Sequence, residues 1–161
     1  MSNIAVFPGS FDPITKGHEN IVRRALPLFD RIIVAVGHNV DKKSLFSIEQ
    51  RMDFIRTTFA DTPDITVETY EGLTVDFCKK HRVNFLLRGL RSIADFEFER
   101  NIALINKELL PNLETVFMFT EPEYSHISST VVRDVLCHGG DVARFLPEAL
   151  GGRVQSPITK N

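Results

Sequence analysis

Five short apolar runs recur along the chain and predict β-strands, at residues 4–7, 32–36, 65–70, 83–87 and 115–119. The second, fourth and fifth runs are apolar at nearly consecutive positions and are rich in β-branched or aromatic residues. That pattern is typical of strands that are buried on both faces of a sheet. We therefore expect helices to cover both sides of these three strands.

Apolar residues at helical spacing lie between the strand-like runs and predict amphipathic helices. The four sets are Ile21, Val22, Ala25 and Leu26; Ile48, Met52, Ile55 and Phe59; Phe98, Ile102, Ile105 and Leu109; and Val131, Val132, Val135 and Leu136. Ser47 and Gln50 have the spacing of a capping box at the start of the second helix. Residues 73–81 show a helical pattern less clearly.

The alternation of strands and helices predicts the fold class. Helices that connect successive strands imply a parallel sheet covered on both faces. We therefore expect a Rossmann-like, doubly wound, five-stranded parallel sheet in a single α/β domain over residues 1–161, with no internal repeat or linker. Ligands of such sheets bind outside the carboxyl ends of the strands, so chemically unusual residues should directly follow strands.

The overall charge limits the possible partners. Apolar residues make up 43% and charged residues 25% of the 161 residues, as in ordinary globular proteins, and the formal net charge is −2. Proteins that coat nucleic acid or an anionic membrane usually carry a basic excess, so neither is expected as a partner. A few placed groups, rather than a general positive field, must hold any anionic ligand.

Other features of the sequence indicate a cytoplasmic protein. Cys78 and Cys137 are too few and too far apart for a zinc cluster, and we expect both thiols to be free. Pro8 interrupts the first apolar run, which no basic segment precedes, so a signal peptide is not expected. No stretch approaches the roughly 18 apolar residues of a membrane span.

The segment after the first strand carries the first candidate chemistry, in the string PGSFDPITKGH at residues 8–18. A glycine at position 9 lets backbone N–H groups approach an anion closely, and Ser10 adds a hydroxyl donor. Thr15 is a candidate helix N-cap, which places His18 in the first turn. There the helix dipole disfavours the imidazolium and favours a neutral ring that donates one N–H. The alternative is an ordinary turn with an exposed histidine.

Further donors follow other predicted strands. The string RGLR at residues 88–91 follows the fourth strand. Its two guanidiniums, which flank a glycine, suit phosphate recognition, although two solvated arginines are the alternative. Residues 124–130 after the fifth strand lead into the last helix, and their hydroxyl groups can cap it or bind phosphate. Lys42 and Lys43 follow the second strand, where a solvated loop is the alternative.

These donors together favour one reaction class. No carboxylate pair or Ser-His-Asp order indicates hydrolysis, and the Walker and Gly-x-Gly-x-x-Gly patterns are absent. A site made of donors fits phosphoryl or nucleotidyl transfer, in which positioning and charge stabilisation provide most of the catalysis.

Two strings resemble the motifs of the nucleotidyltransferase superfamily: TKGH at residues 15–18 and ISST at residues 127–130. Within it the chain resembles the bacterial phosphopantetheine adenylyltransferase family through residues 8–15, the Lys42–Lys43 loop, residues 88–91 and 94–99, and FLP at residues 145–147. Ser10 stands where some members carry threonine, and the hydroxyl is preserved. The resemblance runs through nearly the whole chain.

The resemblance implies an activity: ATP and 4′-phosphopantetheine react reversibly to dephospho-coenzyme A and pyrophosphate, in coenzyme A biosynthesis. The acceptor's own phosphate attacks the α-phosphorus of ATP, with Mg²⁺ as cofactor. The resemblance further implies a homohexamer and coenzyme A as a feedback ligand.

The resemblance also implies site residues. The catalytic residues are His18, which stabilises the transition state, Lys42 and Arg88. The 4′-phosphopantetheine contacts are Ser10, Lys42, Thr74 and Arg88, of which Thr74 is otherwise a possible helix cap. The ATP contacts are Ser10, Phe11, His18, Gly89, Leu90, Arg91, Glu99, Tyr124, Ser125, His126, Ile127, Ser128, Ser129 and Thr130. By composition alone, Glu99 could equally be a solvated helix residue.

Two other functions compete with this one. A nucleotidyltransferase acting on nicotinate mononucleotide or glycerol 3-phosphate fits the first and last motifs, but residues 88–91 and 94–99 argue against it. A non-catalytic module that senses ATP or coenzyme A fits the phosphate-binding groups, but it has no need of a group reserved for the transition state. If the chain were a scaffold without a ligand, the presence of donors at three strand ends would be a coincidence.

Overall fold

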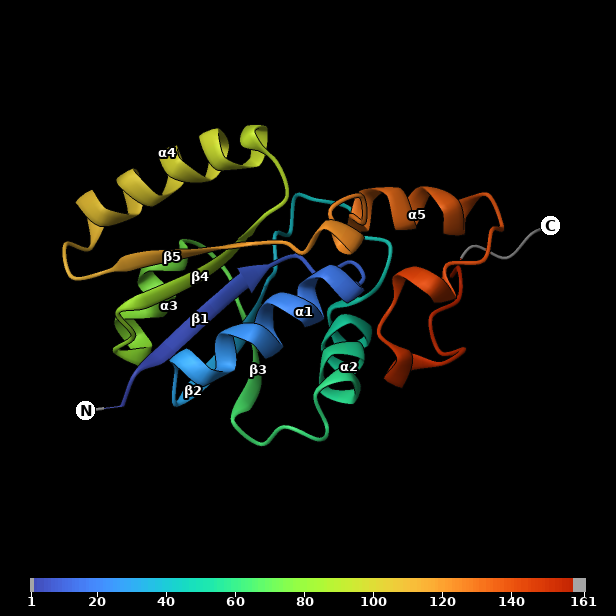
Figure 1. The fold of residues 1–161 in the computed structure, drawn as a ribbon, viewed down its shortest axis with the longest axis horizontal. Helices are drawn as coiled ribbons and strands as arrows, with labels where there is room; N and C mark the ends of the chain where they lie inside the picture. The colour runs from blue at the N-terminus through green and yellow to red at the C-terminus, as the bar shows by residue number, and fades with distance from the viewer. Residues whose placement is uncertain (1, 158–161) are drawn as a thin grey trace.

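A parallel sheet forms the centre of the structure, a computed structural model that describes residues 2–157 (Figure 1). Its strands are β1 (Ile4–Gly9), β2 (Arg31–Gly37), β3 (Ile65–Tyr70), β4 (Phe85–Leu90) and β5 (Glu114–Phe119). They lie in the order β3-β2-β1-β4-β5, and every neighbouring pair is parallel. The strand order reverses beside β1, which confirms the doubly wound α/β fold.

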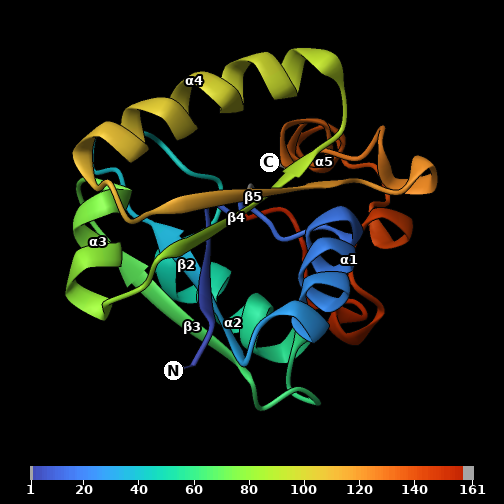
Figure 2. The same ribbon diagram turned by 60° about the vertical axis from the view of Figure 1, so that its left-hand side comes forward.

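Helices cover both faces of the sheet, as the spacing of apolar residues predicts. They are α1 (Lys16–Ala25), α2 (Ile48–Thr58), α3 (Thr74–His81), α4 (Ile93–Leu109) and α5 (Ser129–Cys137). One core layer packs β1 and β2 against α1 and α2, and a second packs the opposite face against α3. Helix α4 runs over the side of the sheet away from α1 (Figure 2).

Capping groups set the beginning of several helices. The Ser47 side chain accepts a hydrogen bond from the N–H of Gln50 and the Gln50 side chain accepts one from the N–H of Ser47, which confirms the predicted capping box. Thr15 is the N-cap of α1, as predicted, and Ser128 caps α5. Because these caps follow β1 and β5, they place two helix N-termini at the carboxyl edge of the sheet.

Two predictions about strands need correction. The fourth strand spans Phe85–Leu90 rather than residues 83–87, so Arg88 lies within the strand and not after it, and Val83 is buried in the segment before it. The fifth strand is not buried on both faces: it is an edge strand that pairs only with β4 among the described residues, and the Phe119 side chain is 79% exposed. An apolar strand at the end of a sheet looks the same in sequence as a central one.

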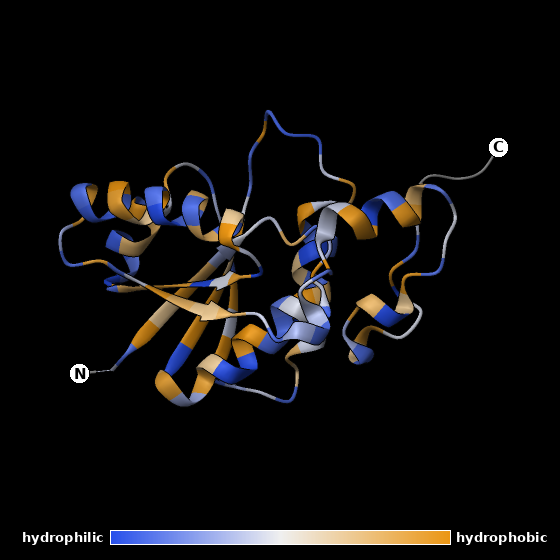
Figure 3. Ribbon diagram, turned by 45° about the horizontal axis from the view of Figure 1, so that its top comes forward, coloured by the Kyte–Doolittle hydropathy of each residue, from blue (hydrophilic) through white to orange (hydrophobic). Residues whose placement is uncertain are grey.

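The apolar stripe of α4 also departs from expectation. Phe98, Ile102, Ile105 and Leu109 lie on a helix as predicted, yet their side chains are 68%, 39%, 59% and 48% exposed. Orange and blue alternate along this helix in Figure 3. Its buried residue is the acidic Glu99. On α5, Val132 and Leu136 are buried as expected, whereas Val131 is 54% exposed.

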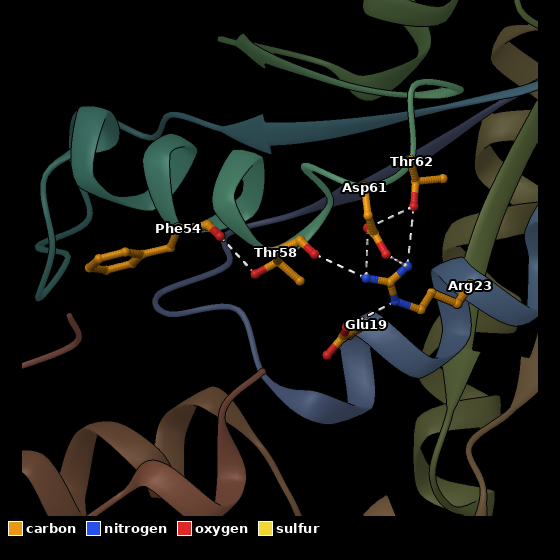
Figure 4. A network of polar contacts seen from close by, with 6 residues as sticks. All are labelled: Glu19, Arg23, Phe54, Thr58, Asp61 and Thr62. Atoms are coloured by element: carbon orange, nitrogen blue, oxygen red, sulfur yellow. Dashed lines mark hydrogen bonds and ion pairs between the residues drawn. The ribbon is translucent and has the colours of Figure 1, made fainter. Parts of the chain in front are cut away.

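Arg23 ties α1 to the turn after α2 (Figure 4). Its guanidinium donates to Glu19 one turn earlier, to the carbonyl oxygen of Thr58 at 3.0 Å and to both carboxylate oxygens of Asp61. The same group lies 5.3 Å from the ring centre of Phe59. This network fixes α1, and with it the loop that precedes α1, against the rest of the domain.

The segment after α5 completes the core layer on the α2 side. Val142, Leu146, Leu150 and Val154 are buried there. Both cysteines are free, as expected, with Cys78 buried and Cys137 exposed. Within residues 2–157 no helix is long and apolar enough to span a bilayer.

Candidate active site

Two adjoining cavities open at the carboxyl ends of β1, β2 and β4. The first has a volume of about 660 Å³ and the second about 430 Å³. Both are lined by Pro8, Gly9, Ser10, Lys42, Arg88 and Glu99. This shared wall stands beside β1, where the strand order reverses and where doubly wound folds bind their ligands.

The second cavity gathers most of the residues predicted to contact ATP. Those that line it are Ser10, Phe11, His18, Gly89, Arg91, Glu99, Ile127, Ser128, Ser129 and Thr130. Four further predicted residues, Leu90, Tyr124, Ser125 and His126, do not belong to this lining. Of these, Leu90 is buried in the sheet, and Tyr124 belongs to the short 3₁₀ helix Pro122–Tyr124.

The first cavity contains all the residues predicted to contact 4′-phosphopantetheine. Ser10, Lys42 and Arg88 form part of its wall, and Thr74 lines it from the start of α3. Thr74 does not cap its helix, because the N-cap is Leu73. Its hydroxyl instead lies 2.9 Å from the hydroxyl of Tyr70. Apolar and amide side chains from α4, such as Ile102 and Asn106, close the far side of the cavity.

His18 is held as a neutral imidazole. The backbone N–H of Thr15 donates to His18 Nδ1 at 3.1 Å, so Nδ1 is the acceptor and the other ring nitrogen, Nε2, carries the proton. Burial lowers the pKa of His18 to about 4, and the positive charges of Arg88 and Arg91 add to the effect. The neutral tautomer agrees with expectation, but its main cause is burial rather than the helix dipole.

Aromatic packing fixes the other side of the His18 ring. The Phe11 ring meets it edge-on, with ring centres 5.0 Å apart, and Phe7 contacts Phe11 in the same manner. Phe11 adopts a positive φ of 46°, which turns the chain sharply after Ser10. A Cβ at Gly9 would lie 3.0 Å from the Phe11 ring, which would then have to shift, so glycine allows this close packing where the chain bends back. The loop therefore presents Ser10 to both cavities.

Arg88 is held in one orientation by three partners. Its Nε donates to Glu99 at 2.9 Å, its Nη2 donates to the second oxygen of the same carboxylate, and its Nη1 donates to the carbonyl oxygen of Pro8. Glu99 is buried, and it uses both oxygens on Arg88. Arg91 is paired in a similar way with Asp95, and its hydrogen bonds, opposed by burial, lower the pKa of that carboxyl.

Several charged residues next to the cavities, among them Arg133, Arg51 and Asp12, are absent from the sequence-based prediction. Arg133 lines the second cavity from α5, one turn after Ser129. Arg51, 3% exposed on α2, donates to the carbonyl oxygen of Ser10 at 2.8 Å. Asp12, 5% exposed, accepts from the N–H groups of Leu45 and Phe46. Of these residues, only Arg133 has a local signal in the sequence, because it follows Ser129 by one helical turn.

The donor set does not itself form a metal site. No group of three or more His, Cys, Asp or Glu side chains suited to a metal ion occurs within residues 2–157. The carboxylates that line the cavities are engaged elsewhere: Asp12 with backbone N–H groups, Glu71 with the His38 ring, Asp95 with Arg91 and Glu99 with Arg88. The wall therefore presents mainly cations, hydroxyl groups and N–H groups, which suit phosphate oxygens.

Comparisons with known proteins agree with this chemistry. The chain matches the family described as cytidylyltransferase-like over residues 6–135. It is 55% identical over 146 residues, or 91% of its length, to the phosphopantetheine adenylyltransferase of Flavobacterium johnsoniae, of which 95% is covered. It is 50% identical over 157 residues to the same enzyme of Carboxydothermus hydrogenoformans, with 98% of this chain and 97% of the relative covered.

A solved structure shares the fold. The bifunctional NMN adenylyltransferase/ADP ribose pyrophosphatase of Francisella tularensis, complexed with AMP and a manganese ion, superposes with a TM-score of 0.67 at 18% identity. The match covers 91% of this chain but only 44% of that one, so the chain spans less than half of that protein's length. At this identity the likeness concerns the fold alone.

Proposed function

The chain belongs to the phosphopantetheine adenylyltransferases of the cytidylyltransferase-like family, and on that premise we propose that its two cavities hold the two substrates of this reaction. The enzyme transfers the adenylyl group of ATP to 4′-phosphopantetheine, giving dephospho-coenzyme A and pyrophosphate. ATP occupies the second cavity, and 4′-phosphopantetheine occupies the first. The dinucleotide-like product then spans both.

The shared wall is the observation that carries this proposal. Direct transfer requires the phosphate of one substrate and the α-phosphorus of the other to meet, and Ser10, Lys42 and Arg88 line both cavities. Neither the Lys42 ammonium nor its neighbour Lys43 has an ion-pair partner among the described residues, so both are available to phosphate. A guanidinium carries five N–H groups, and Arg88 donates three hydrogen bonds to the protein. The remaining N–H groups are available to a phosphate.

Catalysis in this proposal relies on hydrogen-bond donors that the protein holds in position before the substrates bind. Attack by the phosphate of 4′-phosphopantetheine places developing negative charge around the α-phosphorus as pyrophosphate departs. The N–H of His18 Nε2 stabilises that charge, assisted by Ser10, while Lys42 and Arg88 hold the attacking phosphate. Because these groups are fixed by the protein, little reorganisation is needed at the moment of reaction. The protein supplies no nucleophile of its own.

The remaining ATP contacts come from two elements. Gly89 and Arg91 receive the nucleotide at the end of β4, and Ser128, Ser129 and Thr130 offer hydroxyl and N–H donors at the N-terminus of α5. Phe11 and Ile127 supply apolar walls of the same cavity. Leu90, Tyr124, Ser125 and His126, which adjoin these segments in sequence, are proposed as flanking contacts of the nucleotide. Glu99, which the resemblance gives as an ATP contact, acts in this proposal through Arg88 and so orients the group that holds the attacking phosphate.

We propose Mg²⁺ as the metal cofactor. The residues around the cavities do not form a carboxylate site for it, so the ion enters bound to the phosphate oxygens of ATP. Neutralising triphosphate charge is the chemistry that it supplies there.

We propose a homohexamer, and the exposed apolar stripe of α4 offers a surface for contacts between its subunits. Phe98, Ile105 and Leu109 leave an apolar face uncovered on a helix that also lines the first cavity, and contiguous exposed apolar surface marks an interface. We also propose coenzyme A as a feedback ligand, because it contains the 4′-phosphopantetheine group that the first cavity accepts. A cytoplasmic location is consistent with the two free thiols.

Pyrophosphate release tests the acceptor specificity. The purified protein with ATP and Mg²⁺ should release pyrophosphate when 4′-phosphopantetheine is added and should give dephospho-coenzyme A as the product. Nicotinate mononucleotide and glycerol 3-phosphate, the acceptors of other nucleotidyltransferases, serve as matched alternatives. Release with either of these and none with 4′-phosphopantetheine would show that the assignment of the first cavity is wrong.

A further inference from the structure

The loop that carries Lys42 has few connections to the rest of the domain. It runs from the end of β2 at Gly37 to the N-cap of α2 at Ser47, and its residues 39–44 are exposed. At its beginning the N–H of His38 donates to the carbonyl oxygen of Tyr70 and the His38 ring pairs with Glu71. The bonds of Asn39 to Asp41 and Lys42 stay within the loop.

The end of this loop is held by one carboxylate. Asp12 accepts from the N–H of Leu45 at 2.8 Å and from the N–H of Phe46 at 2.9 Å, one bond to each oxygen. Phe46 is itself buried, with its ring centre 5.3 Å from that of Phe54. Within residues 2–157, these are the hydrogen bonds that join the second half of the loop to another segment.

Asp12 is in turn fixed from the ATP side of the site. Its carbonyl oxygen accepts from Arg133 Nη1 at 2.9 Å, and the carboxylate lies 3.9 Å from the same guanidinium. The hydroxyl of Ser129 donates to the next carbonyl oxygen, that of Pro13, at 2.8 Å. Asp12 is therefore the point where the loop after β1, the start of α5 and the Lys42 loop meet.

We propose that Asp12 is a positioning residue that sets Lys42 at the wall between the two cavities. A carboxylate bound to two successive N–H groups fixes the direction in which the chain leaves the loop, and Lys42 lies three residues earlier. Without that anchor the loop remains tethered at His38 and at the buried Phe46 ring, but the segment between them, which carries Lys42, is free to move away from the acceptor phosphate. This inference rests on the proposed role of Lys42 in binding that phosphate.

Asp12→Asn tests the proposal, because the amide keeps the shape and one acceptor but loses the second acceptor and the charge. Loss of a hydrogen bond to a charged group should increase opening of the loop by at least about tenfold. Trypsin cleavage after Lys42 or Lys43 should accelerate by about that factor. The KM for 4′-phosphopantetheine should rise about tenfold, with the KM for ATP within about twofold of wild type.

Asp30→Asn is the matched control. The Asp30 carboxylate also accepts a backbone N–H, that of Asn3 at 2.7 Å, but it lies outside both cavities. This variant should show wild-type cleavage and KM values. If Asp12→Asn does not fold, as judged by circular dichroism, Asp12→Glu retains the charge beside Arg133 while displacing the carboxylate, and the same two shifts are expected.

Combination with Lys42→Ala separates the two proposals. If Asp12 acts through Lys42, the double variant should have no higher a KM for 4′-phosphopantetheine than Lys42→Ala alone. Multiplied effects, or unchanged cleavage and KM in Asp12→Asn, would overturn the role of Asp12. If Lys42→Ala leaves that KM unchanged, the proposed function of Lys42 is at fault instead, and the cleavage rate alone then decides whether Asp12 holds the loop.

Discussion

Both carboxylate oxygens of Glu99 accept hydrogen bonds from the guanidinium of Arg88, eleven residues earlier in the sequence. The pair joins α4 to the end of β4, and Pro8 receives the third hydrogen bond of the same guanidinium. An arginine held in this way has a fixed direction before any ligand binds, which lowers the ordering cost of binding. The acidic residue in the site therefore has a positioning role in the proposed reaction.

Glu99→Gln should weaken the binding of 4′-phosphopantetheine. The neutral amide loses the charge-assisted pair with Arg88, and we expect kcat/KM for this substrate to fall on the order of tenfold. Steady-state kinetics with ATP held at saturation measures the effect. Glu108→Gln, on the same helix but outside both cavities, should be neutral; equal losses in the two variants would argue against a specific role for the pair.

Replacement of His18 by Ala should remove a donor reserved for the transition state. We expect turnover to fall on the order of 10²-fold or more, as when one preorganised donor is lost from an oxyanion site, while ATP binding persists. Single-turnover kinetics and calorimetric titration with ATP separate these effects. The control is His138→Ala, at a histidine whose side chain is 79% exposed at the end of α5. Full turnover in His18→Ala would mean that another group stabilises the transition state.

The lowered pKa of His18 predicts a pH dependence of stability. The pKa is about 4 in the folded protein and about 6.5 when the chain is unfolded, so the unfolded state binds more protons between these values. The free energy of unfolding should therefore decrease as the pH falls from 6.5 to 4. Denaturant titrations across this range should show a shallower decrease in His18→Gln, and an identical slope would contradict the burial of a neutral ring.

The Arg23 network predicts a stability effect without a direct effect on the chemistry. Arg23→Ala removes hydrogen bonds to Glu19, Thr58 and Asp61 and the contact with Phe59, and should lower the free energy of unfolding by about 1–2 kcal/mol. Chemical denaturation measures the change. Arg56→Ala, at an exposed arginine on α2, should cost less. Equal stabilities would show that the network contributes nothing measurable.

The exposed stripe of α4 provides a test of the proposed homohexamer. A carboxylate at Ile105, which is 59% exposed in the single chain, would be buried in an interface formed by this face and should dissociate it. Sedimentation velocity should show hexamers for the wild type and smaller species for Ile105→Glu. Leu28→Glu, at a similarly exposed leucine away from α4, should leave the hexamer intact. Hexamers of Ile105→Glu would place the interface elsewhere.

The sequence predicts the sheet and most of the helices because their signals are local. Hydrophobic spacing predicts α2, the Ser47–Gln50 spacing predicts its capping box, and a position near a strand end predicts Ser10 and Arg88, which the structure places on the wall shared by the two cavities. The spacing on α4 correctly indicates a helix but cannot tell whether its apolar face meets the core or solvent. Pairings across the fold leave no local pattern: Asp12 meets Phe46 at a separation of 34 residues.

Direct transfer between the two cavities can be tested by the stereochemistry at the α-phosphorus. ATP made chiral at that phosphorus should give dephospho-coenzyme A with inverted configuration, because one in-line attack by the acceptor phosphate inverts the centre. The donors of the shared wall, Ser10, Lys42 and Arg88, supply no nucleophile in this account. Retention of configuration would indicate two successive displacements through an adenylylated protein group and would contradict it.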